Sequence, residues 1–394
     1  MDISTICVHG CDKKYDTTGA VSVPIFASST FAHPAVGQST GFDYSRSQNP
    51  TKEHLEQTMT ALEGGTDTIA FSSGMAAVSA LMELFSPGDH IVASYDLYGG
   101  TFRLFSHISE KNGLKFSYAA STEEIGAKIT PATKAVFIET PTNPMMNVVD
   151  IEAVSQLTRR AGSGNNILLI VDNTFLTPVF QRPLSLGANI ALHSGTKYLG
   201  GHNDTLAGML TVKDSAAPSG LTLSERLRFI AKTTGGCLSP FDSFLIIRGI
   251  KTLALRMERH NKTALIVAKW LSSQEKVKKV YYIGLEDHPD YKISCRQASG
   301  FGGMISFSVY DEKTAKSILE NVKIIKYAES LGGTESLITY PLMQTHADLP
   351  PEEREARGIN GCLLRLSVGL EAPDDIIADL EQAFKSGRAA ADVK

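Results

Sequence analysis

Residues 167–204 read ILLIVDNTFLTPVFQRPLSLGANIALHSGTKYLGGHND. The stretch opens with an apolar run that ends in Asp172, the pattern of a buried strand with a carboxylate at its end. Lys197 follows twenty-five residues later, directly after Ser194, Gly195 and Thr196. A buried strand ending in a carboxylate is common, but a lysine beside two hydroxyl residues after a short apolar segment is less so.

These residue types together favour a site for pyridoxal 5'-phosphate (PLP). The Lys197 amine can form a Schiff base, Asp172 can pair with the pyridinium nitrogen, and the hydroxyls of Ser194 and Thr196 can bind the phosphate. Taken alone, Lys197 would be interpreted as a solvated surface lysine, because lysines are seldom buried. The residues around it favour the cofactor site.

The composition is that of a soluble globular protein. The chain has 394 residues, 42% of them hydrophobic and 20% charged, with a formal net charge of −4. That charge provides no basic field for nucleic acid. The segment MDISTICVHG lacks the features of a signal peptide, and no apolar run is long enough for a membrane helix.

The cysteines indicate a reducing compartment. There are five of them, an odd number, and they are scattered along the chain, which argues against a disulfide framework. Cys7 and Cys11 lack further ligands at zinc spacing, and His193 and His202 do not cluster, so we predict no metal site. We expect a cytoplasmic protein without nucleic-acid or membrane partners.

The order of elements predicts an α/β fold. Residues 1–50 are rich in Ser, Thr, Pro and Gly and are interpreted as an extended arm. Residues 51–249 alternate short strand patterns with helical ones, which favours a mostly parallel sheet with helices on both faces. The strands expected there are 68–71, 90–94, 135–138 and 167–171, and the helices are 74–85 and 151–161.

A second α/β domain is expected over residues 250–394. Residues 250–271 carry apolar residues at helical spacing and predict one long helix. Strand patterns follow at 304–309 and 363–368, and a last helix is predicted from Asp374.

Two further features could serve a cofactor. The segment Ser72-Ser73-Gly74-Met75-Ala76-Ala77 follows a strand and opens a helix, where backbone N–H groups can approach an anion. An ordinary strand-to-helix turn has the same residues. Tyr98 follows the strand around Val92 and could stack on a planar ring at the sheet's carboxyl edge, although plain packing explains it equally well.

Two arginines are candidates for binding anions. Arg46 lies in the polar arm next to Tyr44 and could bind a phosphate, or it could lie in a solvated loop. Arg365 interrupts an apolar strand and needs an anionic partner there, either a protein carboxylate or a substrate. The chain has no Walker loop, no GxGxxG after a strand and no GxSxG elbow.

In this order the motifs resemble the Cys/Met-metabolism PLP-dependent enzymes, the trans-sulfuration family of cystathionine β- and γ-lyases, cystathionine γ-synthases and methionine γ-lyases. The resemblance extends from Ser22 to about Phe384. It rests on Tyr44-Ser45-Arg46, Asn49-Pro50-Thr51, Ser73-Gly74-Met75-Ala76, Tyr98-Gly99-Gly100, Glu139-Thr140-Pro141-Thr142-Asn143-Pro144, Asp172-Asn173-Thr174-Phe175, Ser194-Gly195-Thr196-Lys197-Tyr198, Ser330-Leu331-Gly332-Gly333 and Arg365-Leu366-Ser367-Val368-Gly369.

The resemblance implies the fold of type I PLP-dependent transferases, which is aspartate-aminotransferase-like, and a role for each matched residue. Lys197, Asp172 and Tyr98 would be the catalytic residues. The cofactor would also be bound by Gly74, Met75, Asn143, Ser194 and Thr196 and, from a neighbouring subunit, by Tyr44 and Arg46. The substrate would be bound by Arg365, Ser330, Glu329 and Tyr44. The family is usually a homotetramer built from two dimers with shared sites.

Three positions bear on specificity. Methionine γ-lyases carry cysteine where this chain has Gly100, which puts that specificity in doubt. Glu329 would meet the distal amino group of cystathionine, but it is shared by lyases and synthases. Gly195 stands where relatives often have alanine or cysteine, and we expect little effect from it.

The expected activity is cleavage of a carbon–sulfur bond in cystathionine or a related thioether amino acid, giving a thiol, a 2-oxo acid and ammonia. Cystathionine γ-synthase, which joins an O-acylhomoserine to cysteine, is the nearest alternative, and methionine γ-lyase is another. A non-catalytic binding protein with the same fold is a more distant alternative. The sequence does not distinguish β- from γ-elimination.

Overall fold

A computed structural model of the chain describes residues 1–11, 18–161, 167–215, 217–347 and 349–389. Its larger sheet is mostly parallel: only β7 runs against its neighbours β1 and β6. The strand order is β1 (Asp67–Phe71), β7 (Gly208–Val212), β6 (Ile190–Ser194), β5 (Leu168–Asp172), β4 (Thr133–Glu139), β2 (His90–Ser94) and β3 (Lys115–Ala119). The mostly parallel α/β fold predicted from the sequence is confirmed.

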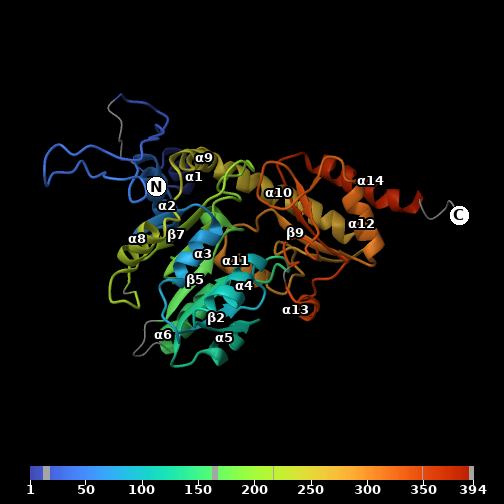
Figure 1. The fold of residues 1–394 in the computed structure, drawn as a ribbon. Helices are drawn as coiled ribbons and strands as arrows, with labels where there is room; N and C mark the ends of the chain where they lie inside the picture. The colour runs from blue at the N-terminus through green and yellow to red at the C-terminus, as the bar shows by residue number, and fades with distance from the viewer. Residues whose placement is uncertain (12–17, 162–166, 216, 348, 390–394) are drawn as a thin grey trace.

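Helices cover both faces of this sheet (Figure 1). Because successive side chains of a strand point to opposite faces of the sheet, each strand contributes residues to two hydrophobic cores. On β5, Leu168 and Ile170 belong to one core, and Leu169 and Val171 to the other. The first face packs on α3 (Gly74–Met82), α4 (Gly99–Leu104), a π-helical turn (Phe105–Ser109) and α8 (Leu223–Thr234), and the second on α2 (Pro50–Glu63), α5 (Thr122–Lys128) and α6 (Ile151–Ala161).

A smaller five-stranded sheet follows towards the C-terminus (Figure 1). Its order is β10 (Lys326–Tyr327), β11 (Leu337–Thr339), β12 (Leu363–Ser367), β9 (Met304–Val309) and β8 (Val277–Tyr281), with only the β10–β11 pair parallel. The remaining helices are α7 (Thr177–Phe180), α9 (Pro240–Ile250), α10 (Leu253–Ser272), α11 (Tyr291–Gln297), α12 (Glu312–Asn321), α13 (Pro351–Ala356) and α14 (Pro373–Ala389).

Residues 18–49 of the N-terminal segment project as loops from the body of the molecule before α2 begins (Figure 1). The segment is not extended throughout, because residues 3–9 form the helix α1 (Ile3–His9), which the sequence analysis did not predict. Asp2 caps this helix, and Ile6 and Cys7 are buried against the neighbouring helices. Seven residues are too few to show helical periodicity clearly.

Two predicted helices differ from the structure at their ends. The helix expected over residues 250–271 begins at Leu253, because α9 ends at Ile250 and the Thr252 backbone leaves helical geometry. The guanidinium of Arg256 fixes this break by donating to the carbonyl of Gly249 at 2.8 Å. The helix expected to reach residue 85 ends at Met82. None of the helices described is long and apolar enough to cross a membrane.

Candidate functional site

A cavity of about 210 Å³ lies at the carboxyl ends of β4, β5 and β6, on the face covered by α3. Most of the predicted site residues line it although they are far apart in sequence: Gly74, Met75, Tyr98, Asn143, Asp172, Ser194, Thr196, Lys197, Glu329, Ser330 and Arg365. The parallel strands explain this convergence, because their carboxyl ends meet at one edge of the sheet.

Lys197 lies in the turn after β6, where its ammonium donates to Ser330 Oγ at 3.1 Å. Burial and, to a lesser extent, nearby Arg365 lower the pKa of Lys197, while Glu329 raises it, and together they bring it to about 8. A substantial fraction of the amine is therefore neutral near pH 7–8, which is the form that attacks a carbonyl.

Asp172 is the last residue of β5. Its Oδ1 accepts hydrogen bonds from the backbone N–H and the hydroxyl of Thr174, at 3.0 and 2.5 Å. Burial raises the pKa of Asp172, while these hydrogen bonds and the His193 side chain oppose the shift. Both hydrogen bonds fall on Oδ1, so within the described part of the chain Oδ2 stays available for a cationic partner.

The start of α3 offers donors for an anion to the same cavity. Gly74 and Met75 are the first residues of α3, so their N–H groups have no partner within the helix. Ser73 caps this helix by accepting from the N–H of Ala76 at 3.1 Å. A Cβ at Gly74 would lie 3.0 Å from Cβ of Ser194, so a larger residue would press on the Ser194 side chain.

Arg365 reaches the same cavity from β12 of the smaller sheet and is buried. It donates to Asn143 Oδ1 at 2.8 Å, to the Ser330 carbonyl at 3.1 Å and to Thr339 Oγ1 at 3.2 Å. Its Nε has no hydrogen-bond partner among the described residues. Burial lowers the pKa of Arg365 to about 10, so it stays cationic at neutral pH.

Ser330 connects the lysine and the arginine. Its hydroxyl accepts from Lys197, its carbonyl accepts from Arg365, and its φ of 130° is unusual for a residue with a side chain. Such strain persists where surrounding contacts enforce it. Glu329, just before it, is exposed at the mouth of the cavity.

Tyr98 precedes α4, and its ring lines the cavity. Burial, followed by the charge of Glu329, raises the pKa of Tyr98, so its hydroxyl holds its proton at neutral pH. A Cβ at Gly100 would lie 2.5 Å from the Tyr98 ring and 3.2 Å from Met75 Sδ. No side chain fits at position 100 without displacing Tyr98.

Tyr44 and Arg46 do not line this cavity. Both are exposed on the projecting N-terminal segment, with the guanidinium carbon 5.5 Å from the centre of the Tyr44 ring. They border a separate cavity of about 1100 Å³ near Arg228.

Sequence reasoning missed two residues of the site. Glu139 ends β4 as Asp172 ends β5, and both line the cavity. The pattern that drew attention to Asp172, an apolar strand that ends in a carboxylate, also fits Glu139, which is part of a quoted motif. Thr174 supports Asp172 and also accepts from the N–H of Ser194 at 2.9 Å, a contact that no spacing predicts.

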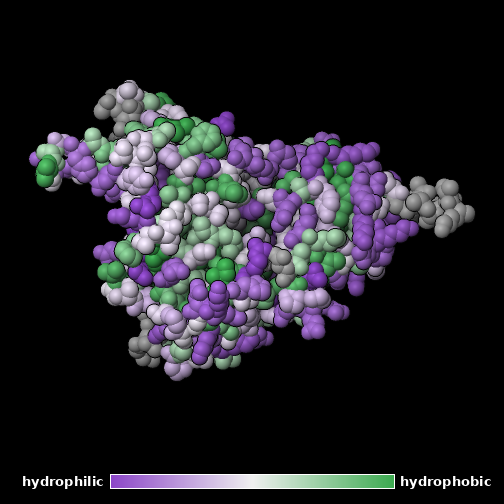
Figure 2. All heavy atoms as spheres, viewed as in Figure 1, coloured by the Kyte–Doolittle hydropathy of each residue, from purple (hydrophilic) through white to green (hydrophobic). Residues whose placement is uncertain are grey.

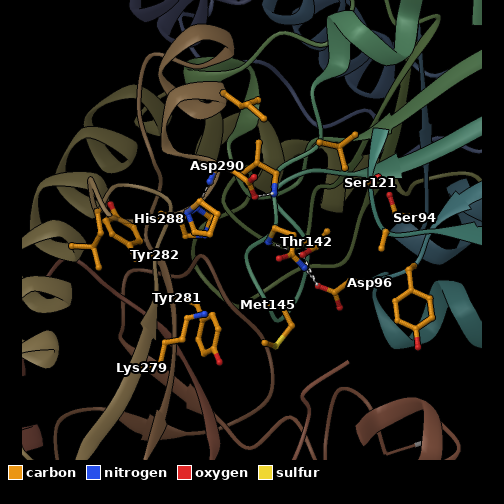
Figure 3. A pocket seen from close by; sticks show the side chains of 18 of the residues that line it. Ser94, Asp96, Ser121, Thr142, Met145, Lys279, Tyr281, Tyr282, His288 and Asp290 are labelled. Carbon is orange, nitrogen blue, oxygen red and sulfur yellow. Dashed lines mark hydrogen bonds between the residues drawn. The ribbon is translucent and has the colours of Figure 1, made fainter. Parts of the chain in front are cut away.

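A larger cavity of about 630 Å³ contains none of the predicted site residues. Figure 3 shows Ser94, Asp96 and Thr142 on one side of it and Lys279 and Tyr281 of β8 on another. It is a groove between the two sheets, and its mixed charges do not converge on one ligand chemistry. The smaller cavity has the functional groups for chemistry.

Comparison with known proteins identifies the family. The family model for Cys/Met metabolism PLP-dependent enzymes matches residues 4–385. The chain belongs to this family. Its cofactor is therefore PLP, as the sequence analysis predicted, and it is an enzyme.

Members of the family with several activities are similar to this chain over nearly its whole length. Cystathionine γ-lyase of Bacillus subtilis is 45% identical, covering 98% of this chain and 100% of its own. Cystathionine γ-synthase of Haemophilus influenzae is 48% identical, covering 97% of each chain. The crystal structure of cystathionine γ-lyase from Lactobacillus plantarum with L-serine has a TM-score of 0.93 at 42% identity, covering 98% of this chain and 100% of that one.

The cavity fits PLP on its own chemistry. It combines a lysine with a lowered pKa, a half-buried carboxylate whose two hydrogen bonds from Thr174 fall on a single oxygen, and helix N–H groups beside two hydroxyls. These are the amine, anion and phosphate partners that the cofactor needs.

Proposed function

We propose that this enzyme is a carbon–sulfur lyase that cleaves cystathionine or a related thioether amino acid by β- or γ-elimination, giving a thiol, a 2-oxo acid and ammonia. The observation that carries the proposal is the arrangement around Ser330, where the Lys197 amine and the Arg365 guanidinium meet in one cavity. This places a base beside a binding point for an amino acid's α-carboxylate.

Lys197 would hold the cofactor covalently, Asp172 would pair with its ring nitrogen, and Tyr98 would stack on the ring. Asn143 would lie on the side of the ring's phenolic oxygen. The phosphate would take the N–H groups of Gly74 and Met75 and the hydroxyls of Ser194 and Thr196. When bound, PLP supplies the electron sink that makes an amino acid's α-proton removable.

The substrate would be oriented by two charges at opposite ends. Arg365 would bind the α-carboxylate through its guanidinium fork, with Ser330 beside it. Lys197 Nζ, neutral in part because its pKa is about 8, would then take the α-proton. Glu329, at the mouth of the cavity, would attract the distal ammonium of cystathionine.

The alternative is cystathionine γ-synthase activity, which uses the same residues for binding and proton removal. The 48% identity to the Haemophilus influenzae synthase favours it as strongly as the lyase relatives favour cleavage. Methionine γ-lyase activity is less well supported, because Gly100 leaves no room for a side chain beside Tyr98.

We also propose that the arm of residues 1–50 completes the site of a neighbouring subunit, with Tyr44 also touching its substrate, in a homotetramer of two dimers. Support comes from Tyr44 and Arg46, which are exposed and stand apart from the cavity of their own chain. Val21 and Val36 on this segment are almost fully exposed, and Figure 2 shows hydrophobic atoms at the far end of the projection. A partner surface would bury them. None of the five cysteines, all of them among the described residues, forms a disulfide, which supports a cytoplasmic location.

Product identification tests the proposal. The purified enzyme is incubated with cystathionine: pyruvate indicates β-cleavage and 2-oxobutyrate indicates γ-cleavage. A parallel reaction contains an O-acylhomoserine and cysteine. Rapid formation of cystathionine in that reaction, with no cleavage of cystathionine, would replace the lyase assignment with the synthase.

A further inference from the structure

Glu139 and Asp172 lie side by side in the interior. They are register partners at the carboxyl ends of the parallel strands β4 and β5. Side chains of register partners share a face, and both residues line the cavity. The Glu139 side chain is buried and that of Asp172 is half-buried at the cavity wall, so two carboxyl groups stand on neighbouring strands with little access to bulk water.

Glu139 also connects the two segments that carry Tyr98 and Asn143. Its Oε2 accepts from the N–H of Tyr98 at 2.8 Å, and its Oε1 accepts from the N–H of Asn143 at 2.9 Å. The Glu139 N–H in turn donates to Ser94 Oγ at 3.3 Å. One carboxyl group therefore holds both residues that would flank the cofactor ring.

The surroundings make it costly for both carboxyl groups to be ionised at once. Burial, then the charge of Asp172, raises the pKa of Glu139 well above its usual range, and burial also raises the pKa of Asp172. Asp96 repels the charge on Glu139 in addition, while Arg365 favours it.

Lys197 and Tyr98 line the same cavity as the pair, and another titratable side chain lies behind it. His193 of β6 favours ionised Asp172, but it points to the other face of the sheet, where its Nε2 lies 2.5 Å from Glu63 Oε1. Two like charges in such a setting titrate as a unit, and one of them keeps a proton.

We propose that Glu139 and Asp172 share one proton in the cofactor-free enzyme and release it to solvent when the cationic ring nitrogen of the cofactor pairs with Asp172. The proposal rests on the assignment of Asp172 to that nitrogen. The cation offsets the charge of Asp172, so Glu139 ionises and accepts more strongly from Tyr98 and Asn143. Glu139 is thus a positioning residue that tightens the site when the cofactor binds.

Proton release on cofactor binding tests this directly. PLP is titrated into the cofactor-free enzyme by isothermal titration calorimetry at pH 7, in two tertiary-amine buffers with different ionisation enthalpies. The difference in heat gives the number of protons exchanged. Lys197 contributes to this number in every variant, so the informative quantity is the difference between variants.

The wild type is compared with Glu139→Gln, which keeps the size of the side chain but cannot ionise. Ser94→Ala is the matched control, because it removes a hydrogen bond to Glu139 and leaves both carboxyl groups. We expect Glu139→Gln to release fewer protons than the wild type by about half a proton to one proton. Ser94→Ala should match the wild type. Equal release by the wild type and Glu139→Gln would overturn the proposal.

A measurement without mutation covers the case in which Glu139→Gln does not fold. Infrared difference spectra of the wild type, with and without PLP, report the C=O stretch of a protonated carboxyl group. Labelling of glutamate and aspartate with ¹³C assigns the band. Loss of this band when PLP binds supports the shared proton. If the cofactor-free enzyme shows no such band, the proposal is overturned. Neither experiment involves turnover, so a failed lyase assignment would be recognised separately.

Discussion

Replacement of Arg365 by lysine tests the substrate-binding end of the site. The guanidinium is buried and uses two of its nitrogens on Asn143, Ser330 and Thr339, while Nε has no partner among the described residues. This geometry holds a planar fork in one orientation. Lysine keeps the positive charge but has a single nitrogen, so it cannot hold a carboxylate with two parallel hydrogen bonds.

The size of the effect follows from the bond that is lost. A hydrogen bond to a charged group contributes about 1.5–3 kcal/mol. At 1.4 kcal/mol for each factor of ten, the loss of one such bond to the substrate raises KM about 10- to 150-fold. Arg365 contacts Asn143, but Lys197 would carry the covalent link to the cofactor and Asp172 would pair with its ring nitrogen, so we expect the visible absorbance of the bound cofactor to change little.

Steady-state kinetics with cystathionine and the absorbance spectrum measure the two quantities. Thr339→Val is the control, because it removes one support of Arg365 and leaves the guanidinium in place. Its KM should rise much less than that of Arg365→Lys. An Arg365→Lys enzyme with unchanged KM and a reduced PLP content would refute the reasoning and make Arg365 a structural link between the two sheets.

Four further predictions concern the cofactor and the arm. Lys197→Ala should lose nearly all turnover and the visible absorbance of the lysine-bound cofactor while circular dichroism shows an intact fold; turnover close to the wild type would contradict the assignment. Asp172→Asn should retain PLP and lose most of its turnover, because the ring nitrogen loses its anionic partner; an unchanged rate and spectrum would leave Asp172 as a strand-end residue only. Because the neutral amine is the reactive form and the pKa of Lys197 is about 8, the rate at which PLP attaches to the cofactor-free enzyme should rise with pH and level off above about 8; a continued rise to pH 10 would argue against the lowered pKa. Mixing Arg46→Ala with Lys197→Ala subunits should restore activity, since one site of a mixed dimer receives neither defect; hybrids proven by mass spectrometry that remain inactive would show that the arm serves its own subunit.

The fold was predictable where the chain's pattern is strong. The strand expected over residues 90–94 is β2, and the one expected over 304–309 is β9, because both are apolar or β-branched runs next to turn residues. β7 was not predicted, although it lies between β1 and β6 and pairs with both in antiparallel orientation. Its sequence, Gly-Met-Leu-Thr-Val, contains both strand and helix formers, and its partners are remote in the chain.

The site was predictable as a set of residues but not as a set of contacts. Family motifs named Asn143 and Arg365 separately, and their hydrogen bond joins residues 222 positions apart. The two roles of Ser330, towards Lys197 and towards Arg365, depend on a backbone angle that no motif encodes. Glu139 has the same strand-end position as Asp172, but its role in holding two backbone N–H groups could not be predicted, because backbone N–H groups carry no signal in the sequence.

The crowding at Gly100 has a consequence for the design of variants. A side chain at this position would meet the Tyr98 ring at once, so positions 98 and 100 cannot be varied independently. A library that changes one codon at a time would test each substitution at Gly100 only together with a displaced Tyr98 ring. Libraries that vary both codons together would reach combinations in which a smaller residue at position 98 makes space for a new functional group beside the cofactor.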